Sequence, residues 1–281
     1  MQTIRLKSWE RFGATLARLR GEAGAEVRML FRGQGDARWP LATTLERRSA
    51  VEFDVARYVR LAAKAAPDLE CLTGRSWDVP TFARLKELIR SKSETFLVHL
   101  PVLDLLVYLR QNGYASPLLD WSESPYVAAY FAYLDAGTAT PAVHCLVRRP
   151  NAVKGGLGGE PMISVQSQHH VGARELQLVQ RTRYTIATRW DHKRSVHVFC
   201  PHEQVLDAGD DHADRLVKIT LPAKDRAAAL RQLEDFGLNH FSLFRSEGAL
   251  VRALETRHFD LDDPEADVTP AWSASPAPLS V

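Results

Sequence analysis

Three stretches of the sequence bring together residue types that bind anions or act on sugars. The first reads FRGQGDARWP over residues 31–40. Arg32 carries a planar guanidinium, which binds phosphate or carboxylate through two parallel hydrogen bonds. Gly33 and Gly35 let the backbone bend and let a ligand come close to it. The alternative is a structural arginine tied to a carboxylate such as Asp36, and these residues alone leave both interpretations open.

The second stretch, SPLLDWSESPYVAAYFAYLDAG, covers residues 116–137. Ser124 followed by a proline predicts the start of a helix, with the serine as its N-cap. Asp120, Trp121 and Ser122 precede that start, and the free N–H groups of a helix N-terminus favour an anion. The alternative is an ordinary capped helix with Trp121 as a core anchor.

The third stretch, RELQLVQRTRYT, covers residues 174–185 and gathers charged and amide side chains, among them Glu175 and Gln180. A polar patch on a strand is usually its solvated face. The patch gains a functional meaning only if it points at the same cleft as Arg32.

The elements that must position these stretches come as helices first and mostly strands afterwards. The alternating residues up to Arg32 predict a strand with Met29 and Phe31 on one face and Leu30 and Arg32 on the other. A preceding helix is expected between the cap Ser8 and the stop Gly21. Further helices are expected at residues 46–66, 81–112 (broken at Pro101 and ended by Gly113), 224–237 and 246–256, and strands at AVHCLVRR, MISVQ, RYTIATR, SVHVFC and RLVKITLP.

This order predicts an α+β fold, with N-terminal helices and a mixed, mostly antiparallel β core. No compositional linker divides the chain, so we expect one domain over residues 1–262. Residues 263–281 are rich in Pro, Ala and Ser with little to bury, which predicts a flexible tail.

Composition excludes several classes of protein. The 281 residues carry a net charge of +2, too little to argue for nucleic-acid binding by itself. The sequence lacks an apolar run of about eighteen residues, so we expect a cytoplasmic protein without a membrane span. The three widely spaced cysteines predict reduced thiols and no structural zinc. His169 and His170 are adjacent and would point to opposite faces of a strand, so no metal site is expected.

Taken in order, FRGQGDARWPLATTLERR, PLLDWSESPYVAAYFA and the block from Gln180 to Thr185 resemble the three blocks of the FRG domain, a bacterial domain named for its Phe-Arg-Gly motif. The late segment FGLNHFSLFRSEGALVRAL resembles the closing part of that family. The resemblance runs from about residue 5 to residue 256. Thr182 departs from it, since a glycine is more usual at that position.

The same three blocks have a weaker resemblance to arginine-type ADP-ribosyltransferases. That resemblance implies an ADP-ribosyltransferase-like fold and an enzyme that uses NAD as a substrate. It implies that Arg32 grips the NAD pyrophosphate, that Ser122 holds a ribose, and that Glu175 or Gln180 is the catalytic residue of the third block. The residues expected to bind NAD are Arg32, Gly33, Gln34, Asp120, Trp121, Ser122 and Tyr184, with Trp121 or Tyr184 stacking on the nicotinamide.

The resemblance further implies a bacterial toxin or phage-defence effector that modifies a macromolecule, either protein or nucleic acid, and that an antitoxin or immunity protein can accompany. The third block lacks the two-glutamate signature of transferases that modify protein side chains. The alternative function is a nucleic-acid-binding or nucleotide-sensing module without transferase activity. It is favoured by arginines that can track a phosphate backbone, namely Arg28, Arg32, Arg38, Arg47, Arg48, Arg174, Arg181, Arg183, Arg189 and Arg194.

Overall fold

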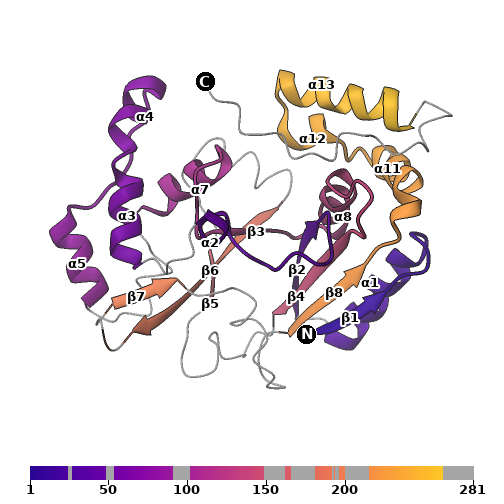
Figure 1. The fold of residues 1–281 in the computed structure, drawn as a ribbon, viewed down its shortest axis with the longest axis horizontal. Coiled ribbons are helices and arrows are strands. Elements are labelled where there is room, and N and C mark those ends of the chain that lie inside the picture. The colour runs from indigo at the N-terminus through magenta and orange to yellow at the C-terminus, as the bar shows by residue number, and fades with distance from the viewer. Residues whose placement is uncertain are drawn as a thin grey trace.

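A mixed, mostly antiparallel sheet runs through the protein (Figure 1). Its strand order is β1-β8-β4-β2-β3-β6-β5, and β7 pairs with β6. The β1–β8 pair is parallel, whereas every other pair of named strands is antiparallel. The strands are β1 Gln2–Arg5, β2 Arg28–Gln34, β3 Leu119–Ser122, β4 Ala142–Arg148, β5 Met162–Val165, β6 Thr182–Asp191, β7 Val196–Phe199 and β8 Arg215–Thr220. The computed structural model describes residues 1–24, 27–48, 54–90, 102–148, 162–165, 181–191, 193, 196–199 and 215–261.

Helices lie between these strands and follow the last of them, which confirms the α+β class for the described residues. The stretch 46–66 expected to be helical contains α3 and overlaps the end of α2, and α4 begins at its last residue. The helices are α1 Arg11–Ala23, α2 Thr44–Arg48, α3 Val55–Ala63, α4 Ala66–Thr73, α5 Phe82–Arg90, α7 Leu103–Gln111, α8 Pro125–Leu134, α11 Arg226–Asp235, α12 His240–Phe244 and α13 Glu247–Glu255, with a 3-10 turn at Ala223–Asp225 and a π-helical segment at Thr256–Leu261.

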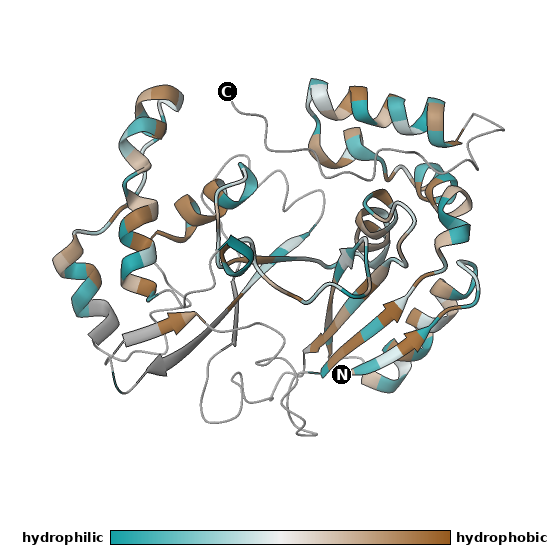
Figure 2. Cartoon of the chain, viewed as in Figure 1, coloured by the Kyte–Doolittle hydropathy of each residue, from teal (hydrophilic) through white to brown (hydrophobic). Residues whose placement is uncertain are grey.

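The two faces of β2 enter different cores, as its alternating sequence predicts. Met29 and Phe31 join the main core, where α1, α8 and α11 cover the sheet. Leu30 lies in a smaller core on the other face, together with Trp121 and Leu146. A third core forms between α3, α7 and the β6 region. In Figure 2 the apolar residues of β4 and β8 mark the strands against which the main core packs.

Helix α8 lies so close to β2 that two positions there accept only glycine. A Cβ atom on Gly33 would lie 1.9 Å from the carbonyl oxygen of Ala128, and one on Gly35 would lie 2.2 Å from the carbonyl oxygen of Asp135. These glycines therefore admit the backbone of α8 and the turn after it. The space in which their Cβ atoms would lie is filled by protein, so both glycines are required for packing; that Gly33 also lets a ligand come close stays a prediction.

Helix boundaries were harder to predict than helix positions. Gly21 lies inside α1, and the helix continues to Ala23 and ends at Gly24, whose φ of 95° is in the left-handed region. Ser8 is not the N-cap, because Glu10 occupies that position. The expected stop at Gly113 is confirmed, with a φ of 83° just after α7.

Several predicted features lie outside the described residues: the helix break at Pro101, the pair His169 and His170, the thiol of Cys200, Arg174 and Arg194, and the tail at 263–281. Within the described part, no helix has the length and apolar character needed to span a membrane. The same residues contain no group of three or more His, Cys, Asp and Glu side chains placed to hold a metal ion.

Candidate functional site

A cavity of about 730 Å³ opens where β2 and β3 separate, and we call it the Arg32 cavity. Strands β2 and β3 pair only at Phe31 and Ser122, whereas β2 pairs with β4 along its whole length. The volume is within the range of small-molecule sites. The cavity is lined by Phe31, Arg32, Gly33, Thr73, Arg75, Tyr108, Arg110, Gln111, Asn112, Asp120, Trp121, Ser122, Ala128, Phe131, Asp135, Thr182, Tyr184, Leu243, Phe244 and Arg245.

Among the described residues, Arg32 is held by a backbone group and not by a carboxylate. Its Nη1 donates to the carbonyl oxygen of Asp120 at 3.0 Å, while no described residue accepts a hydrogen bond from its Nε. Burial lowers the pKa of Arg32 to about 10, against an opposing contribution from the Asp120 charge, so the guanidinium remains protonated at neutral pH. The cation is therefore fixed in place by a neutral contact beside an open cavity, an arrangement suited to an anionic ligand.

Asp36 is not the partner of Arg32, so the structural-arginine alternative is wrong in that form. The Asp36 carboxylate pairs instead with Arg38, whose Nη2 lies 2.6 Å from its Oδ2. The hydrogen bonds from Arg38 lower the pKa of Asp36. Asp36 is thus neutralised outside the cavity.

The carboxylate of Asp120 is engaged by a second arginine. Arg110 Nη2 lies 3.0 Å from Asp120 Oδ2. The Nε of Arg110 and the Oδ1 of Asp120 are buried, and neither has a hydrogen-bond partner among the described residues. Because Asp120 is already paired with Arg110, its charge only partly offsets that of Arg32. The described wall has a net positive charge, since four arginines and two aspartates line it.

Ser122 links β3 to the start of α8. Its Oγ accepts a hydrogen bond from the Ser124 backbone N–H at 3.0 Å, and the Ser124 side chain caps the helix at the Val127 N–H. The predicted N-cap is confirmed. It is the flank of α8, through Ala128 and Phe131, that lines the cavity.

Trp121 and Tyr184 touch the cavity, but both side chains are 1% exposed. The Trp121 indole donates to Thr185 Oγ1 at 2.9 Å, which agrees with the alternative that Trp121 is a core anchor. The Tyr184 hydroxyl accepts a hydrogen bond from Gln111 Nε2 at 2.9 Å. Since protein covers both rings, this geometry does not favour stacking on a ligand for either of them, and Tyr184 acts through its hydroxyl.

Of the remaining predicted site residues, Gly33 lines the cavity and Gln34 does not. Gln34 is buried, and its amide donates to the carbonyl oxygen of Pro40 at 3.1 Å. Glu175 and Gln180 lie outside the described residues. Thr182 is buried in β6, where it pairs with Ser122 of β3.

Sequence reasoning missed the contributions of α7 and α12 to the cavity. The last turn of α7 supplies Tyr108, Arg110 and Gln111, and α12 supplies Phe244. The guanidinium of Arg75 lies 5.8 Å from the Tyr108 ring centroid. These helices show only ordinary apolar spacing, so the sequence carries no local signal for their role. Arg183, one of the arginines that suggested nucleic-acid binding, forms a 3.0 Å ion pair with Glu123.

Of the three comparisons with known proteins, one finds a match, and it covers the first two blocks that build this site. Neither the comparison with curated proteins nor the comparison with solved structures gives a significant match. The family model of the FRG domain matches residues 27–140, a segment that contains β2, β3, α7 and α8 and therefore most of the cavity wall. The chain thus contains an FRG domain, and its Phe-Arg-Gly motif is Phe31, Arg32 and Gly33.

Proposed function

We propose that the Arg32 cavity binds NAD and that the protein is an ADP-ribosyltransferase-like enzyme. The observation that carries the proposal is Arg32, a protonated guanidinium without a carboxylate partner among the described residues, at the wall of a cavity of about 730 Å³. A pyrophosphate is the ligand group that this cation fits best.

The strand order supports the proposal. The arginine block lies on β2, the serine block on the adjacent β3, and the third block leads into β6, the next strand of the sheet. Residues of the first two blocks and the described end of the third, Thr182 and Tyr184, therefore line the same cavity. This is the arrangement that an ADP-ribosyltransferase-like fold requires of them.

The chemistry assigns a role to each block. The bond between the nicotinamide nitrogen and ribose C1′ breaks, and its electron pair leaves with nicotinamide. A nucleophile of the acceptor forms the new bond to C1′ and loses a proton. Positive charge develops on the ribose, so a carboxylate or amide oxygen from Glu175 or Gln180 stabilises the transition state. Arg32 holds the pyrophosphate and Ser122 the ribose.

The acceptor in this proposal is a macromolecule, and the biological setting is a toxin or a phage-defence effector, with an antitoxin or immunity protein as a possible partner. The test is to incubate the purified protein with adenylate-labelled NAD and separate RNA, DNA and protein fractions of a bacterial lysate. We expect released nicotinamide and label on one fraction. Arg32→Gln should abolish both, whereas Arg38→Gln, which alters an arginine outside the cavity, should not. Neither release nor label with the native chain would contradict the proposal.

A nucleotide-sensing module without transferase activity is the second candidate. A transferase needs an oxygen that stabilises the positive charge on the ribose. The described cavity wall offers two carboxylates for this, Asp120, which is already paired with Arg110, and Asp135, and this scarcity favours the second candidate. Such a module would bind NAD and return it intact, so nicotinamide release separates the two functions.

A further inference from the structure

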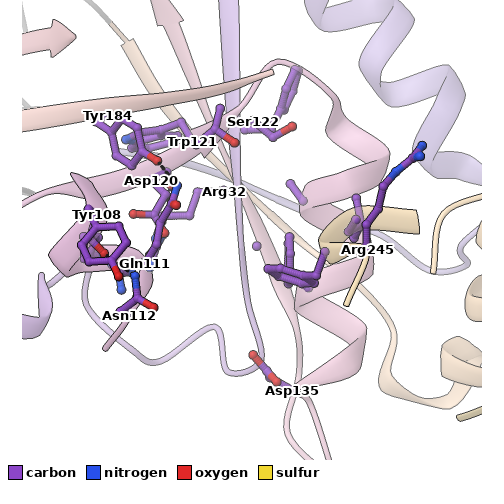
Figure 3. A pocket seen from close by; sticks show the side chains of 18 of the residues that line it. Arg32, Tyr108, Gln111, Asn112, Asp120, Trp121, Ser122, Asp135, Tyr184 and Arg245 are labelled. Atoms are coloured by element: carbon purple, nitrogen blue, oxygen red, sulfur yellow. Dashed lines mark hydrogen bonds and ion pairs between the residues drawn. The ribbon is translucent and has the colours of Figure 1, made fainter. Parts of the chain in front are cut away.

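The last turn of α7 places an amide side chain in the wall of the cavity that also contains Arg32 and Arg110. Gln111 is the final residue of α7 and follows Arg110, the partner of Asp120. Figure 3 shows Gln111 on the same side of the cavity as Asp120 and Arg32, with Arg245 on the other side. No block of the sequence that suggested NAD binding includes this residue.

The Gln111 amide is oriented by a buried hydroxyl. Its Nε2 donates to the Tyr184 hydroxyl at 2.9 Å. Tyr184 is 1% exposed, and burial raises the pKa of its phenol, so the hydroxyl stays neutral across the working range of pH. Gln111 lines the cavity and its Nε2 is engaged by Tyr184, so we infer that the carbonyl Oε1 is the atom of this amide that can accept a hydrogen bond from a ligand.

An acceptor at this place selects among ligands that the arginines alone would not distinguish. A carboxamide offers N–H donors to Oε1 and forms a hydrogen bond with it. A carboxylate offers none at neutral pH, and its oxygens would face the oxygen of Gln111. A carboxylate would therefore forfeit the hydrogen bond to the half-buried Gln111 and add the repulsion of two oxygens.

We propose that Gln111 is a specificity-determining residue that recognises the carboxamide of a nicotinamide dinucleotide. This inference rests on the proposed binding of NAD. It also sets the direction of the ligand. The nicotinamide end lies toward α7 and β6, the pyrophosphate lies on Arg32, and the adenosine end lies toward the apolar wall formed by Phe131, Leu243 and Phe244.

The experiment measures the affinities of the full chain for three ligands by calorimetry: NAD, its nicotinic-acid analogue, in which a carboxylate replaces the carboxamide, and ADP-ribose, which lacks the ring. We expect the native protein to bind NAD about tenfold or more tightly than the nicotinic-acid analogue. Gln111→Leu should reduce this preference to within about twofold and leave the affinity for ADP-ribose unchanged. Tyr184→Phe, which removes the orienting hydroxyl, should weaken the preference in the same way.

Comparing the three ligands on the native chain tests the preference for a carboxamide without any substitution, so the result does not depend on whether a variant folds. Equal affinity for NAD and the nicotinic-acid analogue, or tighter binding of the analogue, would overturn the role of Gln111 and leave NAD binding intact. If Gln111→Leu binds ADP-ribose and still prefers NAD to the nicotinic-acid analogue as strongly as the native chain does, the role of Gln111 is overturned as well. If the native chain binds neither NAD nor ADP-ribose, the proposed function is overturned together with this inference.

Discussion

Replacing Gly33 by alanine tests whether the Phe-Arg-Gly glycine is required for packing or for ligand approach. The added Cβ would lie 1.9 Å from the carbonyl oxygen of Ala128 and 2.7 Å from the backbone nitrogen of Ala132. Both atoms belong to the backbone of α8, so no side-chain rotation relieves the contact. Restoring a normal carbon–oxygen separation of about 3.3 Å requires α8 and β2 to move apart by about 1.4 Å.

That displacement would disturb the main core, because both surfaces are built into it. Ala128, Ala129 and Tyr133 of α8 pack there with Phe31 of β2. Overpacking a core usually costs about 1–3 kcal/mol. Because the added Cβ would clash with backbone atoms of α8, which cannot rotate away, we expect Gly33→Ala to lower the free energy of unfolding by about 3 kcal/mol or more.

The assay is urea denaturation followed by circular dichroism, with Gly21→Ala as the matched control. Gly21 lies inside α1, and a Cβ there would meet nothing within 4 Å. Alanine should therefore stabilise the protein at that position, by about 0.5–1 kcal/mol. If Gly33→Ala unfolds within about 1 kcal/mol of the native protein and only loses ligand affinity, the packing role assigned to this glycine is refuted.

Two further perturbations test the elements around the site. Ser124→Ala removes the side-chain acceptor of the Val127 N–H and should lower the free energy of unfolding by about 1 kcal/mol. The denaturation midpoint measures this loss, and an unchanged midpoint would contradict the capping role. His144 is fully buried between Arg32 and Lys218 in the sheet register, and burial, followed by these two cations, lowers its pKa to about 3. The unfolded chain takes up this proton near pH 6.5, so stability should fall as pH drops from about 6.5 toward 3, by at most about 1.4 kcal/mol per pH unit for this group. His144→Leu should show a smaller loss between pH 7 and pH 4 in the same assay, and an equal loss would contradict the burial of a neutral imidazole.

Local sequence patterns predicted the parts of the fold that depend on local chemistry. The alternation of Met29, Leu30 and Phe31 gave β2 its two buried faces, and Ser124 with Pro125 gave the start of α8. Strand β1 was missed because four residues carry little pattern, and its parallel pairing with β8 joins opposite ends of the chain.

The candidate site was predictable where its residues occur in the sequence blocks, and not where helices bring residues in from elsewhere. Arg32 and Ser122 line one cavity, as their blocks suggested. Gln111 and Phe244 reach it through the packing of α7 and α12, which no short-range spacing encodes. The packing role of Gly33 was not predicted for the same reason, because the backbone that approaches it comes from a helix almost a hundred residues later in the chain.

The affinity of Arg32 variants for ADP-ribose tests the central claim most directly. Hydrogen bonds to charged groups contribute about 1.5–3 kcal/mol, so Arg32→Gln should weaken binding by about 10- to 150-fold while the protein stays folded by circular dichroism. Arg38→Gln changes an exposed arginine paired with Asp36 and should bind like the native chain. Equal affinity of the native protein and Arg32→Gln for ADP-ribose, or no binding by either, would contradict the assignment of the cavity as a pyrophosphate site.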